Sequence, residues 1–180
     1  METLKSFNLF LWLLQAGAVT CLLYTSTDIP LNEEGIRQAE KLAEVLKDTP
    51  LDLVITSPLS RAWVTGKTVA DSHGIPCLTD DRLIEMCFGE FEGTDRRQEA
   101  YQREKRRFFA RYPQGESFMD VAARVYSFLQ DIRETYPDKS ILVASHNGIC
   151  RVMCNYFQDM ENEEFADFAM GNCEVRHVSI

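Results

Sequence analysis

Two segments of the chain place a side chain suited to phosphate shortly after an apolar, strand-like run. Arg61 follows residues 51–56 (LDLVIT), and His146 follows residues 140–144 (SILVA). An arginine fork and the free N–H groups at a helix amino terminus both suit phosphate oxygens. Each residue alone also fits a surface ion pair or a polar turn. Their matched positions after two strands favour one shared phosphate site.

Glu85 is the candidate acid. It lies among apolar residues in the segment 83–93 (LIEMCFGEFEG). Burial of a carboxyl raises its pKa, and a raised pKa allows proton donation near neutral pH. The alternative is an exposed loop acid, an interpretation that suits Glu90 and Glu92 better.

The elements that must position these residues alternate between helix and strand from residue 28 onward. Such alternation predicts an α/β fold, with a mainly parallel sheet flanked by helices on both faces. Ligands of such sheets bind beyond the carboxyl ends of the strands. We expect strands at 51–56, 77–78, 140–144 and 173–178, and helices at 33–49, 59–71, 95–111, 118–135 and 148–157.

The composition is that of one soluble globular domain. The chain has 180 residues, 45% of them hydrophobic and 26% charged, and its net charge is −9. This charge disfavours nucleic acid and anionic membranes as partners, so a small anionic substrate would need a local positive pocket. The basic, aromatic segment 96–111 is interpreted as a solvated helix or a roof over the site, ahead of a nucleic-acid surface. Oligomeric state is left open.

Five short motifs occur in the order found in one protein family. They are D-x-P-L-x-x-x-G-x-x-Q-A at 28–39, S-P-L-x-R-A at 57–62, L-x-E-x-x-F-G-x-x-E-G at 83–93, G-E-S at 115–117 and S-H-x-G at 145–148. Each motif is weak alone, but together they are specific. The chain from about residue 27 onward resembles the histidine phosphatase superfamily, whose fold is phosphoglycerate-mutase-like.

The resemblance implies a metal-independent phosphatase that works through a phosphohistidine, with a phosphoglycerate-mutase-type phosphomutase as the alternative. It implies that Arg61 and His146 hold the phosphoryl group and that Glu85 protonates the leaving oxygen. No cofactor and no metal are implied, and the substrate would be a small phosphorylated molecule. The short length resembles small phosphatases more than glycolytic mutases.

The nucleophile that the family requires is absent. It is the histidine of an R-H-G motif after the first strand, but the first histidine here is His73 and the first arginine is Arg37. We expect His73 at the opposite end of the sheet, and His177 has no phosphate-binding turn around it. The first strand is therefore expected to be missing or replaced. The chain as given is expected to be inactive, or to be a pseudoenzyme that binds phosphate esters.

The amino-terminal segment offers an explanation. Residues 21–26 (CLLYTS) are the translation of TGT CTC TTA TAC ACA TCT, a transposase mosaic end used to prepare sequencing libraries. Our hypothesis is that residues 1–26 are a chimeric, adapter-derived, non-family segment. Residues 27–180 would then be an N-terminally truncated histidine phosphatase domain. The strand character of 18–24 (AVTCLLY) predicts that this stretch fills the gap in the sheet.

Two further features of the sequence each have a functional interpretation and an alternative without a functional role. Lys5, the apolar run 7–14 and Ala16-x-Ala18 imitate a secretory signal peptide, so a secreted protein is the alternative to a cytoplasmic one. Cys150 and Cys154 share a helix face by spacing, but no nearby ligands complete a tetrahedral metal site. The favoured interpretation is buried thiols in a reducing cytosol.

Overall fold

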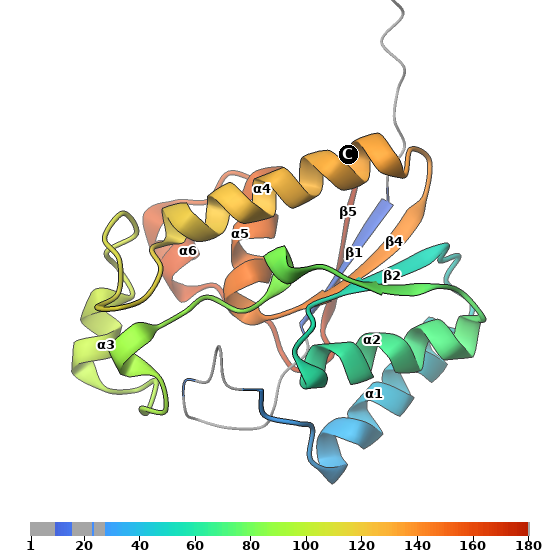
Figure 1. The fold of residues 1–180 in the computed structure, drawn as a ribbon, viewed down its shortest axis with the longest axis horizontal. Coiled ribbons are helices and arrows are strands. Elements are labelled where there is room, and N and C mark those ends of the chain that lie inside the picture. Colours follow the sequence, from blue (N-terminus) through green and yellow to red (C-terminus); the bar gives the residue numbers. More distant parts are fainter. Residues whose placement is uncertain (1–9, 16–22, 24–27, 180) are drawn as a thin grey trace, which may run out of the picture.

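Within the part of the chain that the structure describes, the sheet has five strands, of which four are parallel (Figure 1). The computed structural model describes residues 10–15, 23 and 28–179. The spatial order of the strands is β3-β2-β4-β1-β5, and only β5 runs antiparallel to its neighbour. This confirms the predicted mainly parallel sheet. The strands are β1 Phe10–Gln15, β2 Leu53–Thr56, β3 Cys77–Thr79, β4 Ser140–Ser145 and β5 Val175–Ser179.

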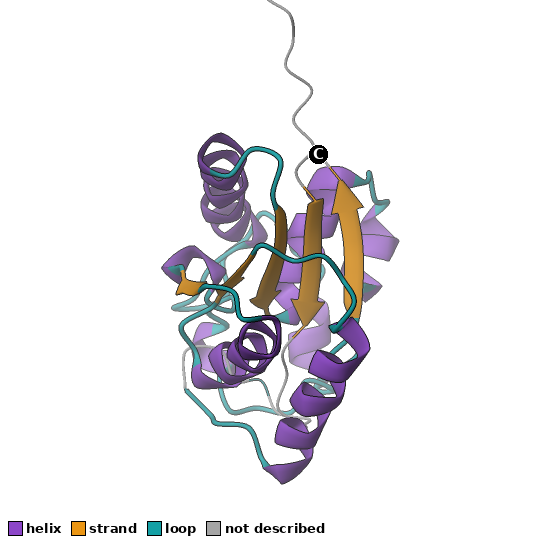
Figure 2. Ribbon diagram, turned by 90° about the vertical axis from the view of Figure 1, so that its right-hand side faces the viewer, coloured by secondary structure: helices purple, strands orange, loops and turns teal. Residues whose placement is uncertain are grey.

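Helices cover both faces of the sheet (Figure 2). Successive side chains along a strand point to opposite faces of the sheet. The sheet therefore has one apolar layer on each face. Leu13 and Val143 belong to the layer beneath α4 (Phe118–Thr135) and α5 (Asn147–Phe157). The opposite layer, which includes Leu14 and Leu142, lies beneath α1 (Glu33–Leu46) and α2 (Ser60–His73).

Local sequence signals explain where the long helices begin and end. The Asn32 side chain accepts a hydrogen bond from the Gly35 N–H at 2.8 Å and caps α1. Gly74, at φ 64°, ends α2 in the left-handed conformation that glycine adopts without strain. Ser117 and Asp120 form a capping box at the start of α4. The starts of α1 and α4 agree with the expected starts at 33 and 118, and α2 ends two residues beyond the expected 71.

The predicted helix over 95–111 is wrong in extent. Only α3 (Glu99–Glu104) is helical, and the following backbone N–H groups of Arg107 and Ala110 bond three residues back, as in successive turns. Two 3-10 turns, Asp81–Leu83 and Gly89–Phe91, lie between β3 and α3. A short helix that the sequence analysis did not predict, α6 (Asn162–Asp167), follows α5.

The amino-terminal segment contributes one strand to the sheet. β1 lies between β4 and β5, with Leu13 opposite Val143 and Gln15 opposite Ser145. The expectation that 18–24 fills this place is wrong, because the strand is Phe10–Gln15; apart from Leu23, that stretch lies outside the described residues. An unbroken apolar run suits a strand buried on both faces. The structure therefore shows a first strand drawn from the segment that precedes the family motifs.

Truncation of one leucine tests whether β1 is part of the folded sheet. Leu13 is 0% exposed in the strand. We expect Leu13→Ala to lower the free energy of unfolding by about 2–5 kcal/mol, because it leaves a cavity in a close-packed layer. The matched control is Val45→Ala, because the Val45 side chain on α1 is 68% exposed. This substitution should change the free energy of unfolding little. If Leu13→Ala left the free energy of unfolding unchanged in chemical denaturation, residues 10–15 would not be in the sheet.

Candidate phosphate-binding site

The carboxyl ends of β2 and β4 meet at one edge of the sheet. Thr56 lies opposite Ala144, and the N–H of the next residue, Ser57, donates to the Ala144 carbonyl at 2.9 Å. Beyond these ends, Arg61 lies in the first turn of α2, and His146 is the N-cap residue of α5. The structure thus places the two predicted phosphate ligands at the same edge.

Both side chains are buried rather than free on the surface. Arg61 is 4% exposed and His146 is 2% exposed. The His146 Nε2 atom hydrogen-bonds the Ser57 Oγ atom at 2.9 Å, which fixes the ring between the two strand ends. Arg61 is therefore not part of a surface ion pair, and His146 is not a loosely held residue of a polar turn, the two alternatives that the sequence left open.

The first motif also contributes to this edge. The Asp28 carboxylate accepts hydrogen bonds from the Ser60 N–H and the Ser60 hydroxyl, both at 2.7 Å. A carboxylate at the start of a helix satisfies free N–H groups and complements the helix dipole. Asp28 therefore holds the first turn of α2, and with it Arg61, at the strand ends.

His146 is held in its neutral form. Burial lowers its pKa well below the ordinary 6.5, and the positive charges of Arg61 and Arg124 lower it further. An uncharged imidazole beside a buried arginine avoids the repulsion between two cations. A bound phosphoryl dianion would supply the opposite charge and favour protonation of the ring.

The lowered pKa of His146 has a consequence for stability against pH. Because the unfolded chain takes up a proton at His146 near pH 6.5 and the folded chain does not, stability falls as pH drops below that value. The slope contributed by this residue approaches about 1.4 kcal/mol per pH unit. Urea unfolding at several pH values measures this slope. Between roughly pH 6.5 and 5, the free energy of unfolding of His146→Gln should depend less on pH than that of the unaltered protein. Equal slopes in the two proteins would contradict a buried neutral His146.

Glu85 lies against the start of α5. Its carboxylate accepts hydrogen bonds from the Gly148 N–H at 3.2 Å and from the Met86 N–H at 2.9 Å. Burial raises the pKa of this carboxyl, although the two N–H groups and the charges of Arg61 and Arg124 oppose the rise. The structure therefore places a carboxyl with a raised pKa at the start of α5, within the electrostatic influence of Arg61.

Gly148 allows this close approach. A Cβ atom at this position would lie 2.5 Å from the Glu85 Oε1 atom, nearer than real Cβ contacts. We expect Gly148→Ala to lower the free energy of unfolding by about 1–3 kcal/mol, because the carboxylate must move off the helix end. Gly171→Ala, where the nearest atom would be 3.6 Å away, is the control for thermal denaturation. A more stable Gly148→Ala protein would contradict the described position of Glu85.

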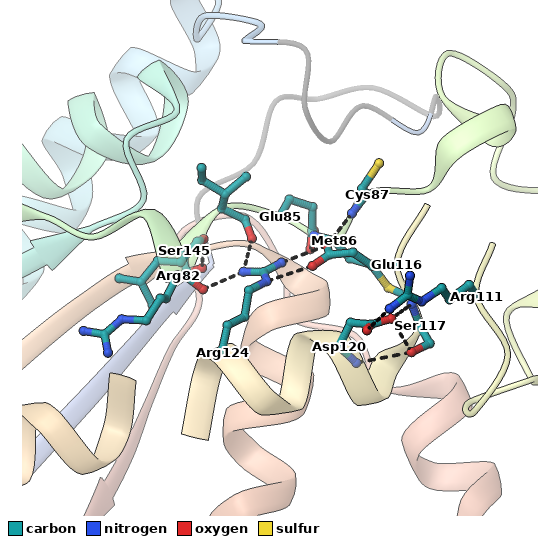
Figure 3. Close-up of polar contacts among 12 residues, drawn as sticks. Arg82, Glu85, Met86, Cys87, Arg111, Glu116, Ser117, Asp120, Arg124 and Ser145 are labelled. Carbon is teal, nitrogen blue, oxygen red and sulfur yellow. Dashed lines mark hydrogen bonds and ion pairs between the residues drawn. The ribbon is translucent and has the colours of Figure 1, made fainter. Parts of the chain in front are cut away.

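One arginine that the sequence analysis did not single out holds the loop of Glu85 (Figure 3). Arg124 on α4 donates to the carbonyls of Arg82 at 2.5 Å and Ile84 at 2.7 Å. It also pairs with Glu116 at 3.0 Å, and Glu116 accepts from the Cys87 N–H at 2.8 Å. The loop is thereby tied on both sides of Glu85. The G-E-S motif pointed to Glu116, but no spacing signal pointed to Arg124.

The other two histidines lie away from the site. His73 is the last residue of α2, and its Nε2 atom bonds the Leu46 carbonyl at 2.9 Å, so it joins the ends of α1 and α2. This confirms its expected place at the opposite end of the sheet. His177 is an exposed residue of β5. The residue that follows β1 in the sequence is Ala16, which lies outside the described residues.

The described parts of the chain add three findings about metal sites, cysteines and membrane spans. Residues 10–15, 23 and 28–179 include no group of three or more His, Cys, Asp or Glu side chains arranged to hold a metal ion. Cys150 and Cys154 are buried free thiols. In the same residues, no helix has the length and apolar character needed to cross a membrane.

A buried arginine and a buried histidine lie at adjacent parallel strand ends of this α/β protein, with an acid beside them, and the chemistry of this arrangement suits a phosphoryl group. The sequence profile of the histidine phosphatase superfamily (branch 1) matches residues 15–180. The chain belongs to this superfamily of phosphatases and phosphoglycerate mutases. The match begins before residue 27, where the sequence motifs begin.

Individual relatives agree with this assignment. The chain is 33% identical over 122 residues to the uncharacterized phosphatase PhoE of Bacillus subtilis, covering 68% of this chain and 61% of that relative. It thus spans less than two thirds of that protein's length. Phosphoserine phosphatase 1 of Hydrogenobacter thermophilus is 29% identical over 152 residues, covering 81% and 72% of the two chains. Mycobacterial glucosyl-3-phosphoglycerate phosphatase with VO3 superposes with a TM-score of 0.82 at 25% identity, covering 93% and 90%.

Proposed function

We propose that this chain binds small phosphate monoesters at the edge formed by Arg61 and His146, and that it does not hydrolyse them. The observation that carries the proposal is the buried, preorganised pair of phosphate ligands in a chain whose sequence has Ala16, not histidine, after β1. Without a nucleophile, a phosphohistidine cannot form on this edge. Binding without turnover is what remains.

Each residue has a defined role in this proposal. Arg61 supplies a desolvated guanidinium fork, which suits two phosphoryl oxygens. His146 donates to a third oxygen, taking a proton as the dianion arrives. We assign to Glu85, with its raised pKa, the role of contacting the ester oxygen as a protonated carboxyl. In the catalytic members that the family motifs describe, the same acid protonates the leaving oxygen.

The substrate class is a phosphorylated small molecule, as in the relatives named for phosphoserine and glucosyl-3-phosphoglycerate. We propose a phosphatase ancestry, because the chain is short, with a phosphomutase as the alternative. Nucleic acid and membranes are not proposed as partners. Several basic side chains of 96–111 are paired with acids, as Arg107 is with Glu104 and Arg106 with Asp167.

Calorimetric titration with orthophosphate tests the proposal. We expect saturable binding that His146→Gln weakens by about tenfold or more, because a hydrogen bond to a charged group is lost. Sulfate, which is similar in shape but is not protonated at neutral pH, should compete. Absence of orthophosphate binding would overturn the proposed function, and so would release of p-nitrophenol from p-nitrophenyl phosphate by the unaltered chain.

We also propose that residues 1–26 are a chimeric, adapter-derived segment joined to a histidine phosphatase domain at residue 27. The support is the missing R-H-G motif and the CLLYTS translation next to the junction. Sequencing the source genome across codons 1–40 tests this. An R-H-G strand in frame with Thr27 would support it, whereas an uninterrupted genomic run encoding CLLYTS would contradict it.

A cytoplasmic location is proposed ahead of a secreted one. The signal-like run 7–14 includes Leu11, Leu13 and Leu14, which are buried in β1. Cleavage after Ala18 would therefore remove a strand from the middle of the sheet. Residues 16–22 of the signal-like segment lie outside the described residues.

A further inference from the structure

Ser57 carries a buried hydroxyl to which the proposed function assigns no role. It follows β2 directly and is 0% exposed. Its Oγ atom lies 2.9 Å from the Nε2 atom of His146 and accepts a hydrogen bond from the Leu59 N–H at 3.3 Å. Its own N–H donates to the Ala144 carbonyl at 2.9 Å. The hydroxyl is therefore held between the His146 ring and Leu59, the N-cap residue of α2.

These two contacts decide the direction of the hydrogen bond between Ser57 and His146. A serine hydroxyl has one proton to donate and two lone pairs that accept. The Leu59 N–H can only donate, so it occupies one lone pair. If Nε2 also donated, the buried hydroxyl proton would find no acceptor among the described residues, and a buried unsatisfied donor is costly. Ser57 therefore donates to Nε2, and the single proton of the neutral ring lies on Nδ1.

The charges around His146 act on the second ring proton. Burial and the positive charges of Arg61 on α2 and Arg124 on α4 lower the pKa of His146. The carboxylates that act on Arg61 are those of Glu85, Asp28 and Glu92. A bound phosphate dianion would offset the two arginine charges and so favour protonation of the ring. The added proton goes to Nε2, because Nδ1 already carries one.

A hydroxyl can pair with Nε2 in both protonation states. When Nε2 gains a proton it becomes a donor, and the Ser57 Oγ atom accepts through its second lone pair. The hydroxyl proton then turns from Nε2 to an oxygen of the bound phosphate. A methyl group in this place would pair with neither state, and a carbonyl would pair only with the protonated ring. Ser57 thus allows His146 to change its charge without leaving a buried nitrogen unpaired.

We propose that Ser57 is a positioning residue that holds His146 as the Nδ1–H tautomer in the free site and accepts a hydrogen bond from Nε2–H once phosphate is bound. This inference rests on the proposed function and adds where the ring protons lie in each state. Because Ser57 occupies Nε2, the Nδ1–H group is the one that donates to the phosphoryl oxygen.

NMR of the ¹⁵N-labelled histidine rings tests the proposal, and the spectrum of His146→Gln identifies the His146 signals among the three histidines. Near neutral pH we expect a protonated Nδ1 and an unprotonated Nε2 in the free protein, and two protonated nitrogens with saturating orthophosphate. In Ser57→Ala the tautomers should mix and the ring should stay neutral with saturating orthophosphate. The Kd for orthophosphate should rise by about threefold to tenfold. Ser57→Thr, which keeps the hydroxyl, should restore the signals of the unaltered chain.

Ser72→Ala is the matched control. The Ser72 hydroxyl lies 3.1 Å from Nδ1 of a different histidine, His73, at the carboxyl end of α2. Its removal should leave the His146 signals and the Kd for orthophosphate unchanged.

An Nε2–H tautomer of His146 in the free, unaltered chain would overturn the role of Ser57 while orthophosphate still binds, and this reading needs no variant to fold. Unchanged His146 signals in Ser57→Ala, with and without orthophosphate, would overturn it as well. Failure of orthophosphate to bind the unaltered chain would instead overturn the proposed function, and with it the phosphate-bound half of the role of Ser57.

Discussion

A chain carrying Gln15→Arg and Ala16→His, which restores R-H-G after β1, is expected to hydrolyse p-nitrophenyl phosphate, whereas the unaltered chain releases no product above background. β1 is parallel to β4 with Gln15 opposite Ser145, so the chain leaves β1 at the edge where His146 begins α5. Loss of a catalytic nucleophile costs about 10⁶ in kcat in a well-studied hydrolase. A gain of about 10³ or more over background is therefore a conservative expectation.

The control for this gain is Gln15→Arg with Ala16→Asn, which adds the same charge but no nucleophile. It should bind phosphate more tightly and show no turnover. A phosphohistidine, stable to base and labile to acid, should be found only in the histidine variant. If the histidine variant binds orthophosphate yet shows neither turnover nor phosphohistidine, the nucleophile is not the only element that the site lacks.

The second large effect is expected at Arg61. Arg61→Met should weaken orthophosphate binding by about 100-fold or more, because truncating one partner of a buried charged pair costs about 2–5 kcal/mol. Arg61 is 4% exposed, and burial lowers its pKa. The negative charges of Glu85, Asp28 and Glu92 oppose this by raising the pKa. Calorimetric titration of orthophosphate measures the change directly.

Arg37→Met is the matched control for Arg61→Met. Arg37 is exposed on α1 and pairs with Glu34 at 2.5 Å. An exposed ion pair contributes little to stability or to a distant site, so the Kd for orthophosphate should not change. If the two variants weaken binding equally, a diffuse positive field binds the phosphate, and Arg61 has no special role.

The strand-to-helix junctions were the most predictable part of the site. Apolar, β-branched runs predicted β2 and β4. Because ligands of parallel sheets bind beyond the carboxyl ends of the strands, these runs also predicted that Arg61 and His146 lie at one edge. The raised pKa of Glu85 followed from its apolar neighbours in the sequence. Each of these expectations depended on local sequence and one topological rule.

The parts that could not be predicted depend on tertiary contacts. Residues 10–15 and 18–24 are both apolar, and only the fit between β4 and β5 selects Phe10–Gln15 as the strand. Arg124 looks like an ordinary polar residue of an amphipathic helix, yet it bonds carbonyls about forty residues away in sequence. Arg151 is likewise a polar residue by spacing, and its burial emerges only when α6 and the start of α4 cover it.

The most direct test of the account is one ³¹P NMR experiment on the unaltered chain with phosphoglycolate. We expect a saturable change of the phosphoglycolate resonance, reversed by orthophosphate, and no orthophosphate release above a protein-free sample over many hours. Release of orthophosphate at a rate proportional to protein concentration would contradict the claim of binding without turnover. Absence of any saturable change would contradict the phosphate site itself.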